Sequence, residues 1–463
     1  MKYVSTRGAA PPVSFVEAVL AGLAPDGGLY VPDRWPTLSP DRLAGMSAVP
    51  YAKAAAQVLG AFAGEEIDAP DLEAMCAAAY ATFDHAAIAP LRQLGPDRWL
   101  LELFHGPSLA FKDVALQLLA RLYEHILQRQ GRRLTIVCAT SGDTGGAAVE
   151  ALRGRANIRL VVLFPEGRIS DIQRRFITTA PDANVRTVAV NGDFDDCQRI
   201  LKSLFRDEAF AREVSLAAVN SINFARLAAQ SVYYFTSAAA LGAPERPVAF
   251  AVPTGNFGDA FAGWMARAMG LPVSRIIAAT NANDILARAL MSGRYARAAL
   301  AATDSPAMDI QAASNFERLM FEAQARDGAA TRRLFERFEQ SGDVTLDPGA
   351  VRRAAEVFVG VSADDAEGAR AMRASMAWGG VVDPHTAVAL AGLQKVEPKP
   401  AGPLVILSTA HPAKFPEAVA AATGAPPHTP PAAVRLGGLA ERFDRLAADA
   451  SAVKAYVRAF AAA

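Results

Sequence analysis

The chain has 463 residues, of which 52% are apolar, enough material for roughly two to three domains with large cores. Its 47 basic and 47 acidic side chains give a formal net charge of zero, and no basic block predicts binding to nucleic acid. The three cysteines are widely spaced, which excludes a disulfide framework and favours a reducing compartment. The six histidines lack the spacing of metal ligands, so no metal site is predicted.

The first ninety or so residues contain Pro- and Gly-rich turns and an Ala-rich helical stretch. They show no strand followed by a turn and a helix, so we predict a separate N-terminal region at residues 1–93. Glu17 interrupts the only apolar stretch near the start, so no signal peptide is predicted. No apolar run approaches the ~18 residues that a membrane helix needs. We therefore expect a soluble, cytoplasmic protein without a membrane partner.

From residue 94 onwards, short apolar runs repeatedly end in Gly- and Ser-rich turns that lead into helical patterns. Such runs are typical of parallel strands that are covered on both faces. The pattern predicts an α/β fold with helices on both sides of a parallel sheet, and ligands at the carboxyl ends of the strands. Residues 340–400 look helical and are expected to cover the sheet. The strand–turn–helix units span residues 99–127, 134–154, 158–179, 247–270, 275–290 and 403–423.

Lys112 lies in the otherwise apolar stretch HGPSLAFKDVALQLL, residues 105–119. A lysine kept out of water has a lowered pKa and becomes a usable amine nucleophile. Taken alone, the pattern is more typical of an ordinary lysine at a helix start whose ammonium group reaches the solvent.

Three further turns follow predicted strands. The first, residues 140–146 (TSGDTGG), offers glycines, hydroxyls and a helix N-terminus to an anion. It lacks the lysine of a nucleotide-binding P-loop, and the alternative interpretation is a Gly-rich turn that binds no ligand.

The second turn, residues 255–259 (GNFGD), has two glycines that can form a cup of backbone N–H groups for phosphate. Its alternative is a tight connection, and Asp259 should point away from a phosphate.

The third turn, residues 408–412 (STAHP), places hydroxyls at a strand end, where they can bind a heteroaromatic nitrogen or simply cap a helix. Together the four turns offer an activated lysine, a phosphate cup, a hydroxyl-rich loop and a ring-nitrogen partner. These are the groups that pyridoxal phosphate needs.

The sequence around these turns resembles threonine synthases of the bacterial and fungal type, which are fold-type II pyridoxal-phosphate enzymes. The resemblance runs nearly end to end and implies two open, twisted, largely parallel sheet domains flanked by helices, plus the N-terminal region. The catalytic core is then residues 94–463, with the cofactor in the cleft between two α/β subdomains. The motifs that carry the resemblance are MKYVSTRG, DGGLYVP, HGPSLAFKD, ATSGDTGGAA, PTGNFGDAFAG, SNFERL and STAHPAKF.

The resemblance also implies roles for individual residues. Lys112 would form the Schiff base with pyridoxal 5'-phosphate and serve as the catalytic base. Asp143 stands where many relatives have an asparagine that faces the cofactor. The cofactor phosphate would be held by Gly255, Asn256, Phe257 and Gly258, and the ring nitrogen by Thr409. Substrate binding is implied for Ser108, Ser141, Thr144, Arg186, Asn220, Asn315 and Arg318.

The implied activity converts O-phospho-L-homoserine and water to L-threonine and phosphate through an external aldimine, by γ-elimination and then β-addition of water. The enzyme would be a carbon–oxygen lyase that ends threonine biosynthesis, acting as a monomer or homodimer. Two alternatives remain open. One is another fold-type II reaction, such as serine or threonine dehydration. The other is a catalytically silent homologue that binds a phosphorylated ligand, although an intact Lys112 argues against it.

Overall fold

The computed structural model describes residues 1–462, and these residues fall into two compact units. We call Met1–His105 with Ser221–Pro427 unit 1, and Gly106–Asn220 with His428–Ala463 unit 2. The residues predicted as an N-terminal region, 1–93, belong to unit 1. Their boundary with a catalytic core at residue 94 stays a prediction.

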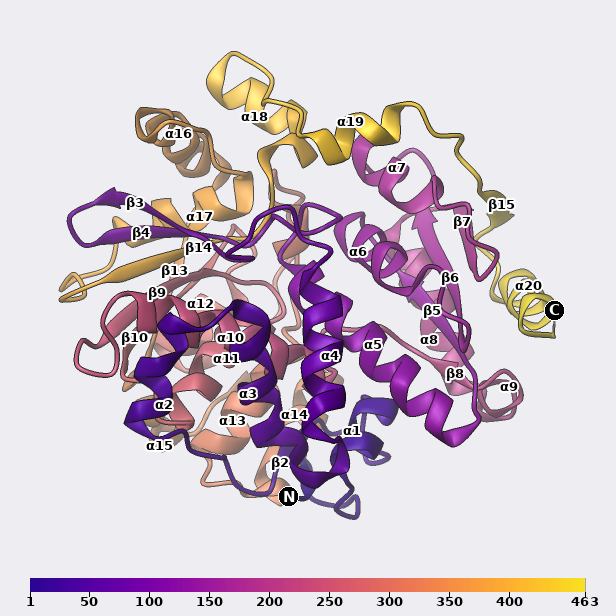
Figure 1. Cartoon of the computed structure of the whole chain (residues 1–463), viewed down its shortest axis with the longest axis horizontal. Coiled ribbons are helices and arrows are strands. Elements are labelled where there is room, and N and C mark those ends of the chain that lie inside the picture. The colour runs from indigo at the N-terminus through magenta and orange to yellow at the C-terminus, as the bar shows by residue number, and fades with distance from the viewer. Residues whose placement is uncertain (463) are drawn as a thin grey trace. The chain divides into compact units, whose positions relative to one another are not determined.

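Unit 2 is built on a five-stranded sheet in the order β15-β7-β6-β5-β8, and every strand pair in it is parallel. The central strands are rich in Val, Leu and Ile and are buried along most of their length, because helices cover both faces. Figure 1 shows α6 on one side of this sheet and α20 on the other. The strands are β5 (Leu134–Ala139), β6 (Ile158–Pro165), β7 (Val185–Asn191), β8 (Leu216–Ala217) and β15 (Asp444–Ala447).

The helices of unit 2 bury amphipathic faces against this sheet. In α8, for example, Cys197, Ile200 and Leu204 recur at helical spacing and pack with Val188 of β7 in one apolar cluster. The helices are α5 (Lys112–Gln130), α6 (Asp143–Leu152), α7 (Asp171–Thr178), α8 (Phe194–Arg206), α9 (Glu208–Glu213), α19 (Pro431–Gly437) and α20 (Ala450–Ala462).

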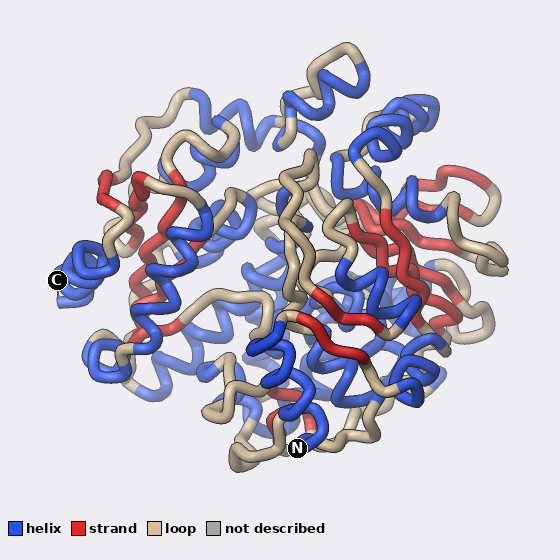
Figure 2. Tube along the Cα trace, turned by 180° about the vertical axis from the view of Figure 1, so that it is seen from behind, coloured by secondary structure: helices blue, strands red, loops and turns tan. Residues whose placement is uncertain are grey.

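Unit 1 contains a six-stranded sheet in the order β13-β10-β9-β14-β4-β3, with only the β3–β4 pair antiparallel. Figure 2 shows its long strands lying side by side. From β9 the chain continues to β10 on one side, whereas β14 lies on the other side of β9. Ligands of parallel sheets bind outside the carboxyl ends of strands at such a reversal. The strands are β3 (Leu91–Gly95), β4 (Arg98–Glu102), β9 (Val248–Pro253), β10 (Val273–Thr280), β13 (Phe358–Ser362) and β14 (Leu404–Ser408).

Helix α17 (Pro384–Leu393) covers one face of this sheet, where Ala387 and Leu390 pack with Ala251 and Ile406. Helices α10 (Phe224–Ala240) and α11 (Gly258–Ala268) cover the other face (Figure 1). The other α-helices of unit 1 are α1 (Phe15–Ala21), α2 (Pro40–Gly45), α3 (Tyr51–Ala63), α4 (Ala69–Tyr80), α12 (Ile285–Ser292), α13 (Phe316–Ala323), α14 (Gly328–Ser341), α15 (Pro348–Ala355), α16 (Asp365–Ser375) and α18 (Pro416–Thr423).

The first residues of the chain are bound tightly within unit 1. The short antiparallel pair β1 (Tyr3–Ser5) and β2 (Tyr30–Pro32) is followed by Arg7, which forms an ion pair with Glu317 of α13 at 3.1 Å. Thr6 donates its hydroxyl to the same carboxylate at 2.6 Å. Two remaining short strands, β11 (Arg294–Ala296) and β12 (Asp343–Thr345), pair with each other.

The predicted α/β class with largely parallel sheets is confirmed, and the apolar runs at 134–139, 248–252 and 404–407 are strands. The expectation that residues 340–400 are helical was wrong at β12 and at β13. β13 has a physical reason for being missed. This strand is short and lies at the sheet edge, and its glycine weakens the strand pattern. A Cβ atom at Gly360 would lie only 2.8 Å from the backbone of α12, so close packing requires the glycine. Among residues 1–462, no helix is long and apolar enough to cross a membrane.

Candidate active site

The residues that the sequence analysis singled out divide between the two units, and each set is described within its own unit. In unit 2, Lys112 is the first residue of α5, and the loop of residues 106–111 precedes it. Asp113 holds this loop in place, because its carboxylate accepts the backbone N–H of Ser108 at 2.8 Å and the Ser108 hydroxyl at 2.7 Å. A side chain at Gly106 would collide with that carboxylate, 2.6 Å from Oδ2. Ser108 therefore shapes the turn that presents Lys112.

The surroundings of Lys112 are less apolar than the sequence suggested. Its Nζ lies 3.6 Å from Oδ2 of Asp143, and the two side chains are 12% and 7% exposed. The other Asp143 oxygen accepts a hydrogen bond from Gln173 of α7 at 3.0 Å. Since Asp143 is the first residue of α6, the helix dipole also favours its negative charge. The resulting ion pair directs the lysine amine to the carboxyl edge of the unit 2 sheet, where β5 ends.

The loop before Asp143 depends on glycine. Gly142 has φ +129° and ψ −79°, a combination open essentially to glycine alone. Thr140 secures the loop, because its hydroxyl oxygen accepts the N–H groups of Gly142 and Gly145 at 2.9 and 2.8 Å. Ser141 and Thr144 are half-buried in the same loop. The structure thus brings Ser108, Ser141, Asp143 and Thr144 to the strand edge where Lys112 lies.

Asn220 and Arg186 differ in position. Asn220 follows β8, whose neighbour is β5, so it extends from the same strand edge as Ser141. Its buried Oδ1 has no hydrogen-bond partner among the described residues, which fits an amide that awaits a ligand. Arg186 is exposed on β7, and its guanidinium lies 4.8 Å from the ring of Phe460 in α20. It therefore lies on the sheet face opposite α5 and α6, and its implied contact with substrate beside Lys112 has no support.

In unit 1, residues 255–258 connect β9 to α11. Phe257 has φ +65°, in the left-handed region, whereas Gly255 and Gly258 do not have positive φ. The backbone N–H groups of residues 255–258 have no protein acceptor in the described part of the chain. Unpaired N–H groups of this kind at a helix N-terminus form an anion site. The loop therefore has the donors that a phosphate requires.

Both glycines of this loop pack closely against neighbouring residues. A Cβ atom at Gly255 would lie 2.9 Å from the carbonyl oxygen of Ala307, and one at Gly258 would lie 3.1 Å from Nδ2 of Asn315. Asn315 also donates its backbone N–H to the carbonyl oxygen of Asn256 at 3.1 Å. The SNFERL segment thus supports the loop from behind.

Thr409 follows the last residue of β14, and β14 pairs with β9 through Ile406 and Ala251. The two strands are parallel, so Thr409 and the 255–258 loop extend from the same edge of the unit 1 sheet. Thr409 is 6% exposed. Its hydroxyl makes no hydrogen bond among the described residues, although its backbone N–H is bound to Thr386 at 3.3 Å.

Asp259 points away from the loop, as the sequence analysis expected. Its Oδ1 accepts hydrogen bonds from the Tyr233 and Tyr234 hydroxyls of α10, at 2.5 and 3.0 Å. Burial raises the pKa of this carboxyl to about 7, although the two tyrosine donors oppose the shift.

This raised pKa predicts a pH dependence of stability. The folded protein holds the Asp259 proton more tightly than the unfolded chain, whose ordinary pKa is 3.8. The free energy of unfolding should therefore fall as pH rises from about 4 to about 7, and level off above. Asp259→Asn, which keeps an acceptor for both tyrosines, should gain stability relative to the parent at pH 8 but not at pH 4.5. Thermal melts in saturating cofactor measure this, and an equal difference at both pH values would contradict it.

Arg318 of α13 is fully buried, with 0% exposure. It donates to the backbone carbonyl oxygens of Tyr30 (3.1 and 3.0 Å) and Ile222 (2.6 Å), and to the side chain of Asn315. Burial lowers the pKa of this guanidinium to about 9. Four donor contacts to protein acceptors favour a structural role, in which Arg318 joins β2, the start of α10 and the support of the phosphate loop.

Replacing Arg318 by lysine separates this role from the implied contact with substrate. An ammonium group cannot reproduce the planar fork of donors, and buried carbonyl oxygens lose their partners. We expect the free energy of unfolding to fall by at least about 2 kcal/mol. Urea unfolding of the loaded protein gives this value. Unchanged stability together with a raised KM would instead place Arg318 in contact with substrate.

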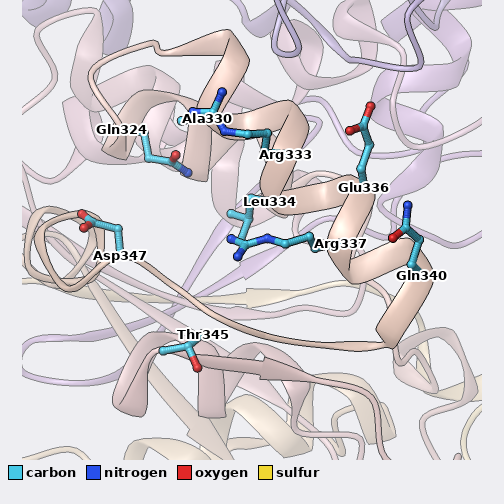
Figure 3. A pocket seen from close by; sticks show the side chains of 9 residues that line it. All are labelled: Gln324, Ala330, Arg333, Leu334, Glu336, Arg337, Gln340, Thr345 and Asp347. Carbon is cyan, nitrogen blue, oxygen red and sulfur yellow. The ribbon is translucent and has the colours of Figure 1, made fainter.

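Two hollows in unit 1 contain none of the predicted site residues. One, of about 490 Å³, lies beside α14, where Leu334 and Arg337 face Thr345 and Asp347 (Figure 3). The other, of about 530 Å³, includes Leu404 at the amino end of β14, opposite the edge that carries Thr409. Neither hollow therefore competes with the strand edges as the candidate site.

Comparison with known protein families finds matches along most of the chain. Residues 2–80 match the threonine synthase N terminus, residues 85–409 the pyridoxal-phosphate dependent enzymes, and residues 386–457 the threonine synthase C-terminal region. Threonine synthase of Pseudomonas aeruginosa is 46% identical over 450 residues, which cover 96% of this chain and 95% of that protein. The Saccharomyces cerevisiae threonine synthase is 40% identical, with coverages of 90% and 88%.

Solved structures are similar over the same extent. The pyridoxal-phosphate-bound threonine synthase from Brucella melitensis superposes with a TM-score of 0.97 at 47% identity, and each chain is covered completely. Yeast threonine synthase has a TM-score of 0.93 at 36% identity, covering 100% of this chain and 99% of that one.

Proposed function

Because the chain belongs to the threonine synthase family of pyridoxal-phosphate enzymes, we propose that it converts O-phospho-L-homoserine and water to L-threonine and inorganic phosphate. The observation that supports this substrate most is the bonding of the N-terminal segment. Thr6 and Arg7 both bind Glu317 in the SNFERL motif. The lysine and phosphate loops are features expected of many pyridoxal-phosphate enzymes, whereas this N-terminal connection is not.

The cofactor is pyridoxal 5'-phosphate, and the residues present fit it. The unpaired N–H groups of residues 255–258 suit its phosphate, and the Thr409 hydroxyl suits its ring nitrogen. When bound, the cofactor withdraws electrons from the substrate α-carbon and stabilises negative charge there. A neutral hydroxyl partner leaves the ring nitrogen largely unprotonated. The ring then withdraws electrons more weakly than a ring whose nitrogen is paired with an aspartate.

We assign Lys112 the covalent attachment of the cofactor and, once its amine is released by substrate, the removal of the α-proton as general base. Asp143, 3.6 Å away, holds the lysine chain by charge attraction, and Gln173 orients Asp143 in turn. The position of Asp143 next to the amine supports a role in keeping the base aimed at the α-carbon.

For the substrate, we propose that the hydroxyl groups of Ser141 and Thr144 bind the carboxylate. The side-chain amide of Asn220 would contribute to binding the phosphate. Ser108, Asn315 and Arg318 act through the turns that they hold, as their hydrogen bonds suggest. We include no role for Arg186.

We further propose that the enzyme is a carbon–oxygen lyase of the cytoplasm that acts as a monomer or homodimer. Its three cysteines are buried and form no disulfide among the described residues, which supports a reducing compartment.

The test is product analysis with the purified, cofactor-loaded protein. Given O-phospho-L-homoserine, it should release threonine and phosphate in equal amounts. L-Serine and L-threonine serve as competing substrates, and formation of their 2-oxo acids is measured in parallel. Efficient oxo-acid formation without threonine synthesis would contradict the proposal.

A further inference from the structure

Three side chains at the start of α17, Asp383, His385 and Thr386, form a buried network. Their exposed fractions are 0%, 4% and 0%. From the sequence they look like an ordinary helix start, with Asp383 as the cap and Pro384 as the first helical residue. Capping explains the aspartate, but it does not require a buried imidazole or a buried hydroxyl beside it.

The carboxylate of Asp383 is the anchor of the network. Its Oδ1 accepts the backbone N–H of His385 at 2.9 Å and lies 2.9 Å from Nδ1 of the same residue. Its Oδ2 accepts the Thr386 hydroxyl. Both following side chains are thereby fixed in orientation, and each extends to a different part of unit 1.

The Thr386 arm reaches the end of β14. Because the Thr386 hydroxyl gives its hydrogen to Asp383, its oxygen is free to accept the Thr409 N–H, which lies 3.3 Å away. The Ser408 hydroxyl lies 3.2 Å from the same oxygen. The backbone that carries the Thr409 side chain is therefore held by Thr386.

The His385 arm reaches the phosphate loop. With Nδ1–H directed at Asp383, Nε2 is the acceptor, and the N–H of Ala307 points to it at 3.3 Å. The carbonyl oxygen of Ala307 lies 2.9 Å from where a Cβ atom of Gly255 would be. His385 thus fixes the segment against which the 255–258 loop packs.

We propose that Asp383, His385 and Thr386 are positioning residues for the cofactor, and that they hold both ends of its site in unit 1. Thr386 aims the Thr409 hydroxyl at the ring nitrogen, and His385 seats the loop that binds the phosphate. This inference rests on the roles proposed for Thr409 and Gly255, but it does not depend on which substrate is turned over.

The experiment compares Thr386→Val, which is nearly isosteric and lacks the hydroxyl, with Thr386→Ser, which keeps it. Thr331→Val is the matched control, because Thr331 is also fully buried and its hydroxyl donates to the carbonyl oxygen of Asp327, the N-cap of its own helix α14. The readouts are the dissociation constant of pyridoxal phosphate and the absorption spectrum of the bound cofactor. We expect Thr386→Val to weaken binding about five- to tenfold, the effect of one buried hydrogen bond, and to shift the absorption maximum. Thr386→Ser should keep the dissociation constant and the absorption maximum of the parent protein, because it keeps the hydroxyl.

Thr409→Val is the reference for the size and direction of the spectral shift. If it shifts the spectrum and Thr386→Val behaves like Thr331→Val, the positioning role is overturned while the assignment of Thr409 stands. If Thr409→Val itself has no effect on spectrum or affinity, the role of Thr409 and this inference fail together. Neither result bears on the substrate, which the product analysis decides.

Discussion

Lys112→Ala is expected to lower kcat for threonine formation at least about a thousandfold, since loss of a general base alone costs roughly 10²- to 10⁴-fold. The covalent attachment of the cofactor is lost with the same amine. The variant should still fold, because Asp143 keeps its hydrogen bond from Gln173. It should retain cofactor weakly through the 255–258 loop. Stopped and continuous assays of phosphate release, with cofactor in excess, measure the loss.

The matched control is Lys202→Ala. Lys202 is exposed on α8, on the other face of the unit 2 sheet, so its removal should leave kcat unchanged. Near-normal threonine formation by Lys112→Ala would show that Lys112 has no catalytic role and is an ordinary lysine at a helix start.

Gly142→Ala should also impair catalysis, although less than Lys112→Ala. Any side chain at φ +129° is strained by about 1–3 kcal/mol, and its Cβ atom would lie 2.5 Å from the carboxamide carbon of Gln173. Gln173 must then move, and Asp143 loses the partner that orients it toward Lys112. We expect kcat/KM to fall at least about tenfold, because misplacing a catalytic group is costly. The strain and the collision should also lower thermal stability.

Two further variants separate strain from collision. Gly167→Ala tests positive φ alone, because φ there is +69° and nothing lies within 4 Å of its added Cβ atom; activity should stay normal. Gln173→Ala in the Gly142→Ala background removes the collision, so partial recovery of folding stability is expected. Full activity of Gly142→Ala would show that the Asp143 geometry is not needed.

The sequence predicted the parts of the fold that rest on local composition. Continuous apolar strands such as residues 134–139 and 248–252 are recognisable because both faces are buried. Strand β13 was missed because Gly360 and its edge position weaken the signal. At the 255–258 loop the glycines were recognised, but Phe257 takes the left-handed conformation. The glycines pack closely against Ala307 and Asn315, and no local pattern reveals these contacts.

Contacts between distant residues account for most of what the sequence analysis did not find at the site. The Lys112–Asp143 pair joins two helix starts, and motif matching placed both residues without indicating that they meet. The network of Asp383, His385 and Thr386 depends on partners at 307 and 409, so only its helix cap is visible in the sequence. Arg318 was singled out by its motif, but its backbone carbonyl partners appear only in the folded chain.

The most direct test of the role of Lys112 is to locate the amine that carries the cofactor. Reduction of the loaded protein with borohydride, followed by digestion and mass spectrometry, marks the lysine that is covalently bound to pyridoxal phosphate. We expect a single modified peptide with the added mass on Lys112, and none after the same treatment of Lys112→Ala. Modification at another lysine, such as the buried Lys414, with Lys112 unmodified, would contradict that role.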